Sequence, residues 1–217
     1  MQNKSKLTLE GIEVRAVAIP MRRPIVSKVG IYQDWPFILI DVKTTEGVVG
    51  RSYLEPYLKE AVRYIGPAIL DLAEMLKGRQ LAPLDFFRDA MSKLHLIGRQ
   101  GVSLIAAAGV DMAVWDAFAK AAGLPLAELL GGSVGQLRTY NTNGLWLIPL
   151  DKLGREAEEL VAEGNFNAIK IRLGRPTLRQ DLEALKAVRA AIGPDIELMC
   201  DFNQGLALHE QSLDVTV

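Results

Sequence analysis

Three consecutive stretches decide the fold of the C-terminal part: FNAIKIR (166–172), LRQDLEALKAVRAAI (178–192) and IELMCDF (196–202). The first and third are short and apolar, as buried strands are, whereas the second repeats apolar residues at helical spacing. A strand, a helix and a strand at this spacing predict a parallel βαβ unit. In parallel sheets of this kind, functional sites lie at the carboxyl ends of the strands.

The same alternation extends towards the N-terminus. Leu137–Asn143 is predicted to be a strand and Leu150–Glu163 a helix, so three strands and their helices are expected after residue 135. Leu206–Val217 would be the next helix, but its amphipathic pattern ends after Glu210. The polar residues at the predicted strand ends are Thr142, Lys170, Arg172, Asp201 and Asn203.

The N-terminal part begins with predicted strands. Apolar residues alternate over Leu7–Ile19, and Pro20 is expected to end this strand. Met21–Pro36 contains two prolines and a glycine and is predicted to be a loop. Phe37–Lys43 and Val48–Leu54 flank a short turn and predict a hairpin. The three strands together predict an antiparallel meander.

Helices are predicted next, over 58–76, 84–96 and 103–122. Gly123-Leu124-Pro125 is a helix stop, and a short turn is expected near residue 126. Strands followed by helices are typical of an α+β domain. The sequence therefore predicts an α+β domain over 1–135 and a β/α domain over 136–217.

Composition narrows the class of protein. The chain has 217 residues, of which 49% are hydrophobic, so it can bury a core. Its net charge of −1 gives no electrostatic reason to bind nucleic acid or an anionic membrane. Neither a signal peptide in Met1–Glu10 nor a membrane span of roughly 20 apolar residues is expected. A single cysteine, Cys200, excludes an internal disulfide, fits a cytoplasmic protein and is expected to pack in the core.

The strand-end residues suggest proton-transfer chemistry. Alternation places Lys170 and Arg172 on one side of their strand. Neighbouring cations disfavour each other's protonation, so the lysine could accept a proton, while the arginine stays charged and stabilises an anion. Asp201 is a candidate ligand for a hard divalent ion such as Mg²⁺, and Asn203 a candidate partner for a substrate hydroxyl.

Structural interpretations of the same residues stay open. A lysine or arginine at a strand end is commonly a solvated charge, and a lone aspartate is commonly a helix cap or turn residue. Asn203 suits a turn better than Asp201 does, and Thr142 is also simply a good strand former.

One helical segment carries a family resemblance. AAAGVDMAVWDAFAK (106–120), followed by Pro125-Leu126 and by Leu129-Leu130-Gly131, resembles the signature of the mandelate racemase and muconate lactonizing enzyme family of the enolase superfamily. The resemblance extends to about residue 209 and is strongest to the mandelate racemase group. It implies an α+β capping domain followed by a modified (β/α)₈ barrel, a cytoplasmic location and, for the complete protein, a homo-oligomer.

In this family, loops of the capping domain close over the substrate. The resemblance places these loops at Ile25–Tyr32 and Tyr53–Tyr57. It makes Ile25, Val29 and Tyr57 candidate substrate contacts. The apolar first loop favours an aryl or alkyl 2-hydroxy acid, whereas Glu55 favours a polyhydroxy acid; alternatively, the apolar residues only pack on the barrel rim.

The resemblance also implies a reaction, the Mg²⁺-assisted abstraction of a proton alpha to a carboxylate. Lys170 matches the residue that stabilises the substrate carboxylate, and Arg172 occupies the position of the base. Asp201 matches the first of three carboxylate ligands of the metal, and Thr142 and Asn203 match substrate contacts. Because arginine is a poor base at neutral pH, racemisation with two bases is less expected than dehydration or epimerisation with one.

Length sets a further expectation. A (β/α)₈ barrel takes roughly 250 residues, whereas about 80 follow residue 135. A truncated chain is therefore expected, with a frameshift near residue 210 as the favoured cause, and it should lack two metal ligands and catalytic activity. The competing hypothesis is a non-catalytic remnant or interaction module with an exposed strand edge at Ile196–Phe202.

Overall fold

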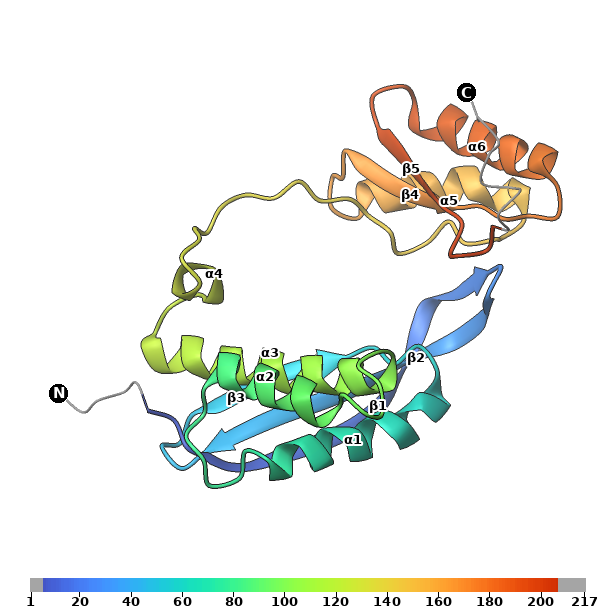
Figure 1. The fold of residues 1–217 in the computed structure, drawn as a ribbon. Helices are drawn as coiled ribbons and strands as arrows, with labels where there is room; N and C mark the ends of the chain where they lie inside the picture. The colour runs from blue at the N-terminus through green and yellow to red at the C-terminus, as the bar shows by residue number, and fades with distance from the viewer. Residues whose placement is uncertain (1–5, 207–217) are drawn as a thin grey trace. The chain divides into compact units, whose positions relative to one another are not determined.

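The computed structural model describes residues 6–206, which form two compact units (Figure 1). The first unit contains the chain up to Ile19 together with Trp35–Gly135. The second contains Pro20–Asp34 together with the chain from Gln136 onwards. The proposed domains remain 1–135 and 136–217. Within the first of them, the segment Pro20–Asp34 makes its contacts with the second unit. The predicted helix over Leu206–Val217 falls almost wholly outside the described residues.

The first unit is built on a three-stranded antiparallel sheet, as predicted. Its order is β1 (Leu9–Ser27), β2 (Gly30–Thr44) and β3 (Val49–Leu54). In the antiparallel pairing of β2 with β3, Ile38 lies opposite Leu54. Alternate residues of β2, from Ile38 to Val42, are fully buried, so one face of the sheet forms the core.

The predicted loop over Met21–Pro36 is wrong. β1 continues through Pro20 and Pro24 to Ser27, and β2 begins at Gly30, so this segment is the far end of a long hairpin. β1 is the edge strand of the described sheet. A proline can occupy an edge strand where its missing N–H faces away from the neighbouring strand, which explains why neither proline ends β1.

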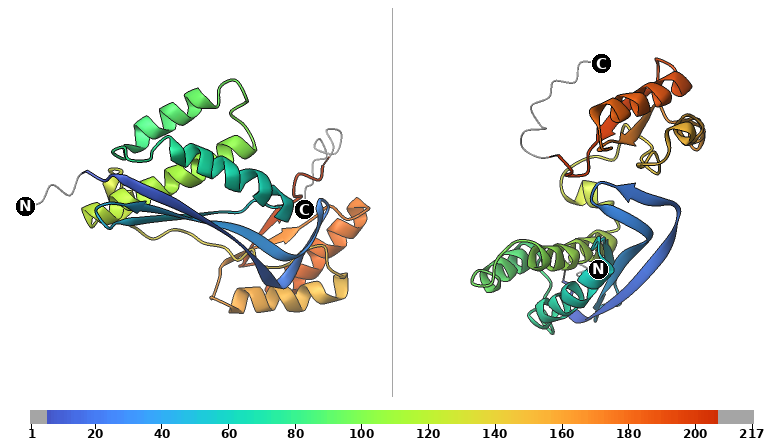
Figure 2. Two further views of the ribbon diagram at one scale, coloured as in Figure 1. Left: turned by 90° about the horizontal axis from the view of Figure 1, so that it is seen from below. Right: turned by 90° about the vertical axis from the view of Figure 1, so that its right-hand side faces the viewer.

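Helices cover the buried face of the sheet (Figure 2). They confirm the predicted helical segment, with bounds η1 (Lys59–Ala61), α1 (Val62–Glu74), α2 (Pro83–Lys93), α3 (Val102–Ala122) and α4 (Leu126–Leu129). Gly123 ends α3 in the left-handed conformation, with φ of 68°. The small residues of α3 permit close packing: the Ala113 carbonyl oxygen lies so near Gly50 that an added Cβ would stand 2.0 Å from it.

Helix α3 also corrects an expectation. Contrary to the sequence prediction, this 21-residue helix is long and apolar enough to cross a membrane by length and composition. In this structure, Val110, Ala113 and Ala117 are fully buried in the core that α3 forms with the sheet and α1.

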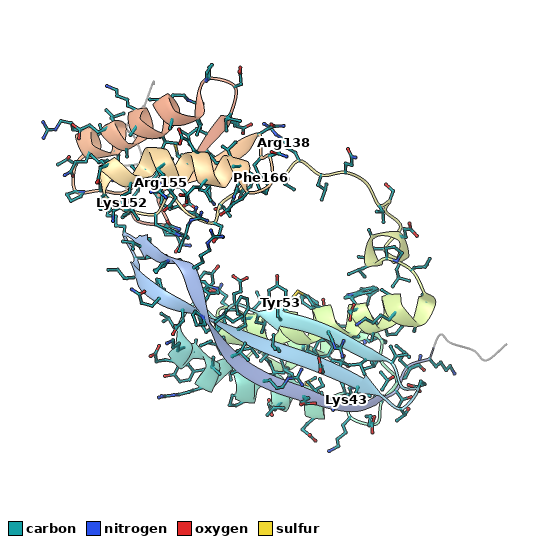
Figure 3. The ribbon with its side chains drawn as sticks, turned by 180° about the vertical axis from the view of Figure 1, so that it is seen from behind. Lys43, Tyr53, Arg138, Lys152, Arg155 and Phe166 are labelled. Carbon is teal, nitrogen blue, oxygen red and sulfur yellow. The ribbon has the colours of Figure 1, made fainter. Side chains whose placement is uncertain are left out.

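Ion pairs lie on the open face of the sheet. Arg15 binds Glu13 and Asp41, and Lys43 binds Glu13, which links β1 to β2 by ion pairs. Lys43 and Tyr53 are labelled on this sheet in Figure 3. The two pairs of Glu13 join exposed side chains and contribute little stability individually, whereas Asp41 is largely buried.

The second unit contains the predicted parallel βαβ arrangement. Its elements are α5 (Leu150–Ala162), β4 (Ala168–Arg172), α6 (Leu178–Ile192) and β5 (Glu197–Asp201). β4 and β5 are parallel neighbours, with Arg172 opposite Asp201. Ile169 and Ile171 are fully buried in a core shared with α5 and α6, which directs Lys170 and Arg172 to the other face.

The predicted strand Leu137–Asn143 is reduced to one parallel bridge, between Asn141 and Ile169. Beyond Asn141, side chains rather than a neighbouring strand bind several backbone N–H and carbonyl groups. Arg172 binds the carbonyl oxygens of Thr142 and Gly144, and Glu156 accepts the N–H of Leu145. The chain therefore bulges away from β4 after Asn141 and returns to it at Leu145, whose carbonyl oxygen accepts the backbone N–H of Arg172.

Cys200 is exposed, and its predicted place in the core is wrong. It lies on the face of β5 opposite to Asp201, and the outer edge of β5 has no partner strand in the described sheet. Neighbouring protein atoms still remove part of the water around the sulfur atom, which raises the pKa of the thiol.

The contact of α3 with Gly50 predicts a sharp steric effect. Gly50→Ala should destabilise the chain by about 1–3 kcal/mol, because the new methyl group meets a backbone oxygen that has no alternative rotamer. Gly11→Ala is the matched control, since nothing lies within 4 Å of an added Cβ there. Urea denaturation measures both, and equal stabilities of the two variants would contradict the packing described.

Candidate active site at the strand ends of the second unit

Lys170 and Asp201 form an ion pair between the neighbouring strands β4 and β5. The Lys170 Nζ lies 3.0 Å from Asp201 Oδ2, and the two side chains are 18% and 31% exposed. The same ammonium lies 5.5 Å from the centre of the Tyr140 ring. The two chemically active side chains that the sequence placed at strand ends are therefore brought together, with partial access to solvent.

Asp201 is an ionised carboxylate in this setting. Burial alone would raise its pKa, but the backbone N–H of Asn203 and the ammonium of Lys170 outweigh burial and hold that pKa below its usual value. Asn203 N donates to Asp201 Oδ1 over 2.7 Å. Both oxygens of the carboxylate are thus engaged, one by each partner.

Asn203 has a turn conformation and a buried functional group. Its φ is 48° and that of Gln204 is 59°, so both residues are left-handed. The amide oxygen Oδ1 of Asn203 is buried and has no hydrogen-bond partner among the described residues. The turn interpretation and the substrate-contact interpretation are therefore compatible.

Arg172 is a buried cation, 5% exposed, so the interpretation of a solvated surface charge fails for it. Its Nη1 donates to the carbonyl oxygens of Thr142, Gly144 and Lys170 at 2.8, 3.2 and 3.4 Å. Burial lowers the pKa of Arg172, an effect opposed by the negative charge of Asp201. The guanidinium contacts backbone rather than the Lys170 ammonium, so it acts as a fixed charge.

Trp146 is a site residue that the sequence did not indicate. Its ring lies over the guanidinium of Arg172, with 4.0 Å between Arg172 Cζ and the ring centre, and the residue is 8% exposed. Sequence spacing gave no signal for it, because it lies in a loop. An aromatic residue shortly after a predicted strand end is the feature that could have identified it.

Unpaired polar atoms gather at this end of the sheet. Buried polar atoms normally have hydrogen-bond partners. Within the described part of the chain, the buried side-chain atoms that lack one are Thr142 Oγ1, Trp146 Nε1, Arg172 Nε and Asn203 Oδ1. All four belong to the segments at the strand ends, so this is where a ligand would satisfy them.

Asp181 holds the loop between β4 and α6. It accepts the backbone N–H groups of Gly174 and Arg175 at 3.0 and 3.1 Å, and its carboxylate pairs with the Arg175 guanidinium at 3.4 Å. Arg175 in turn donates to the carbonyl of Arg172. This buried pair fixes the backbone beside the site and was not predicted.

The predicted lid residues fall in both units. Ile25 is half-buried and Val29 is 55% exposed, and both belong to the hairpin segment of the second unit. Tyr57 belongs to the first unit, where its ring packs edge-on against Trp35 at 5.6 Å. The substrate contacts of all three residues remain predictions.

The described residues do not by themselves fit a Mg²⁺ site. Among them, no group of three histidine, cysteine, aspartate or glutamate side chains could hold a metal ion. Asp201 is the carboxylate at the strand ends, and Lys170 and Asn203 engage it. Mg²⁺ requires more oxygen ligands than one carboxylate supplies.

Comparison with known families agrees with the fold. The sequence profile of the mandelate racemase / muconate lactonizing enzyme N-terminal domain matches residues 10–131. The profile of the enolase C-terminal domain-like family matches residues 152–215. Curated relatives of the chain include dehydratases, racemases and epimerases.

Individual relatives are longer than this chain. Arabinonate dehydratase of Saccharolobus solfataricus is 31% identical over 80% of the chain and 47% of its own length. A magnesium-bound enolase from the alpha proteobacterium BAL199 shares 47% identity, covering 94% of this chain and 57% of that one, with a TM-score of 0.90. A Bradyrhizobium enolase complexed with magnesium and mandelic acid shares 37% identity, covering 97% and 57%, with a TM-score of 0.87. The chain thus spans about half the length of these proteins.

The ion pair predicts a pH effect on stability. The lowered pKa of Asp201 stabilises the fold above its ordinary value of 3.8, and this contribution is lost as the pH falls through the folded-state pKa. Lys170→Met should raise the pKa of Asp201 and reduce the loss of stability between neutral and acid pH. Urea denaturation at several pH values measures the stability, and carboxyl NMR measures the pKa.

Lys152→Met is the matched control, because Lys152 is exposed on α5 (Figure 3). An unchanged Asp201 pKa in Lys170→Met, or an equal shift in Lys152→Met, would contradict the role of the ion pair.

Proposed function

Because the chain belongs to the mandelate racemase / muconate lactonizing enzyme family, we propose that its strand-end site serves the abstraction of a proton alpha to the carboxylate of a 2-hydroxy acid. The observation that carries this proposal is the cluster of Lys170, Arg172 and Asp201 surrounded by buried polar atoms without partners. Since the chain spans about half its relatives' length, this is the activity of the complete protein.

Each residue has a proposed role. Lys170 is the mobile amine of the site, able to bind the substrate carboxylate and to carry a proton. Arg172 cannot move freely, because its Nη1 is engaged by carbonyl groups, so it stabilises developing negative charge from a fixed position. Thr142 and Asn203 offer unpaired polar atoms to a substrate hydroxyl.

The buried position of Arg172 favours one of the possible outcomes. A racemase of two bases needs a proton acceptor on each side of the substrate, and Arg172 is engaged and permanently charged. Dehydration or epimerisation through one base does not require Arg172 to accept a proton. An acid-sugar dehydratase is therefore our preferred variant, and the dehydratase among the relatives supports it.

Mg²⁺ enters the proposal as a property of the family. Solved structures that resemble this chain include some that contain magnesium. Asp201 is the proposed first ligand in the complete protein, but further ligands must come from outside the described residues. The chain alone is proposed to be inactive for this reason.

The proposed reaction and family suggest the binding partner, location and oligomeric state of the complete protein. A small carboxylate is the proposed partner, and the family suggests a cytoplasmic homo-oligomer without nucleic-acid or membrane binding. The charge of −1 is consistent with that proposal, since it provides no basic surface for polyanions.

A second candidate is a non-catalytic interaction module. It is favoured by the single carboxylate at the described site and by β5, whose outer edge is unpaired in the two-stranded sheet. An unpaired edge tends to associate with other strands. Under this alternative the chain would associate but would not respond to Mg²⁺.

Deuterium exchange at the alpha carbon tests the proposed function. The complete protein, with Mg²⁺ in D₂O, should replace the alpha proton of a 2-hydroxy acid such as mandelate or arabinonate, as followed by NMR. Lys170→Met should slow this exchange by about 10²-fold or more, since a positioned acid–base group contributes that much. Lys152→Met should leave the rate unchanged, and exchange that is insensitive to Lys170 would refute its role.

Product analysis separates the variants of the proposal. A 2-keto product indicates dehydration, whereas recovered hydroxy acid with deuterium in the inverted configuration indicates racemisation or epimerisation. The 217-residue chain is measured in parallel. Metal-dependent exchange by that chain alone would overturn its proposed inactivity.

A further inference from the structure

The hairpin segment Pro20–Asp34 is tied to the second unit along its length. Arg23 Nη1 lies 2.8 Å from Glu163 Oε1, and Arg23 Nη2 lies 3.4 Å from Glu159 Oε2. The backbone N–H of Leu147 donates to the carbonyl of Val26 at 2.7 Å. The hairpin is therefore held both by side chains on α5 and by the backbone of the loop that crosses the strand ends.

Arg23 is inserted into this unit rather than laid over its surface. Its side chain is 10% exposed, and Nη1 also donates to the carbonyl of Asn143 at 3.2 Å. An added Cβ at Gly144 would lie 3.2 Å from Arg23 Cδ and 2.6 Å from Glu156 Oε1. Glycine at 144 thus leaves room for the arginine to pass between the loop and α5.

Glu163 makes two different attachments with one carboxylate. Oε1 pairs with Arg23 of the hairpin, and Oε2 accepts a hydrogen bond from Asn141 Nδ2 over 3.0 Å. These hydrogen bonds, first that of Asn141 and then that of Arg23, lower the pKa of Glu163. The carboxylate is therefore charged and shared between the hairpin and the first segment of the sheet.

Asn141 links Glu163 to the backbone next to the candidate site. Its Oδ1 accepts the N–H of Asn143 at 3.0 Å, and its Nδ2 also donates to the carbonyl of Leu160. Thr142 lies between these two asparagines, and its carbonyl is bound by Arg172. A change in the orientation of Asn141 would consequently displace a backbone oxygen that fixes the buried guanidinium.

We propose that Glu163 is a positioning residue that couples the hairpin to the Asn141–Leu147 segment, so that hairpin movement and the geometry around Arg172 change together. This inference rests on the proposed function in one respect only. If Ile25 and Val29 contact the substrate as proposed, substrate binding would affect both the hairpin and the Asn141–Leu147 segment. The coupling itself is a property of the chain. It predicts reciprocal effects between the two segments.

Amide hydrogen exchange on the 217-residue chain tests the coupling. Glu163→Ala should accelerate exchange about tenfold or more in both 22–31 and 141–147, and leave the protection of α6 unchanged. Glu158→Ala, an exposed position on the same helix, should change neither segment. Acceleration in only one segment would overturn the proposal.

The decisive variant is Asn141→Ala, because the Asn141 side chain bonds to α5, to Glu163 and to Asn143 rather than to the hairpin. A purely local role would leave hairpin exchange unchanged. Coupling through Glu163 predicts faster exchange in 22–31, and no further acceleration there when Glu163→Ala is added. Additive effects in the double variant would also refute it.

Asn141→Ser is the second variant if Asn141→Ala fails to fold, as judged by the protection of α6. The exchange experiment requires no turnover. Failure of the alpha-proton assay would therefore leave this result intact, and loss of coupling would leave the proposed reaction untouched.

Discussion

The buried guanidinium of Arg172 is the charge around which the strand ends are organised. Placing a cation in the interior is unfavourable unless its donors are satisfied. Here carbonyl oxygens of the Thr142–Gly144 loop and of β4 accept from it, and the Trp146 ring covers it. The Thr142–Gly144 segment is thereby held against the guanidinium at the strand ends, and Lys170 is the cation that pairs with Asp201.

Local sequence signals predicted most of the second unit. Short apolar stretches identified β4 and β5, and helical spacing identified α6 with its observed bounds. Alternation also placed Lys170 and Asp201 on neighbouring strand ends, where they now form an ion pair. These successes share one cause: the patterns have periods of two or 3.6 residues and are complete within a short segment.

The remaining features depend on partners far away in the sequence. The prolines of Met21–Pro36 suggested a loop because nothing local shows that β1 is an edge strand. Leu137–Asn143 has strand composition, yet Arg172 and Glu156 capture the backbone groups beyond Asn141. The stacking of Trp146 on Arg172 and the Arg23–Glu163 pair likewise join residues far apart in the sequence. Predicting these features requires knowledge of which distant residues contact each other, and not only the spacing of apolar residues along the chain.

The tip of the hairpin also limits how such a protein can evolve. The Lys28 side chain lies against the backbone of two loops: an added Cβ would stand 3.3 Å from its Cδ at Gly174 and 2.6 Å at Gly205. A side chain gained at either glycine would have to displace Lys28. Homologous sequences that keep a long side chain at this hairpin position should therefore also keep both glycines.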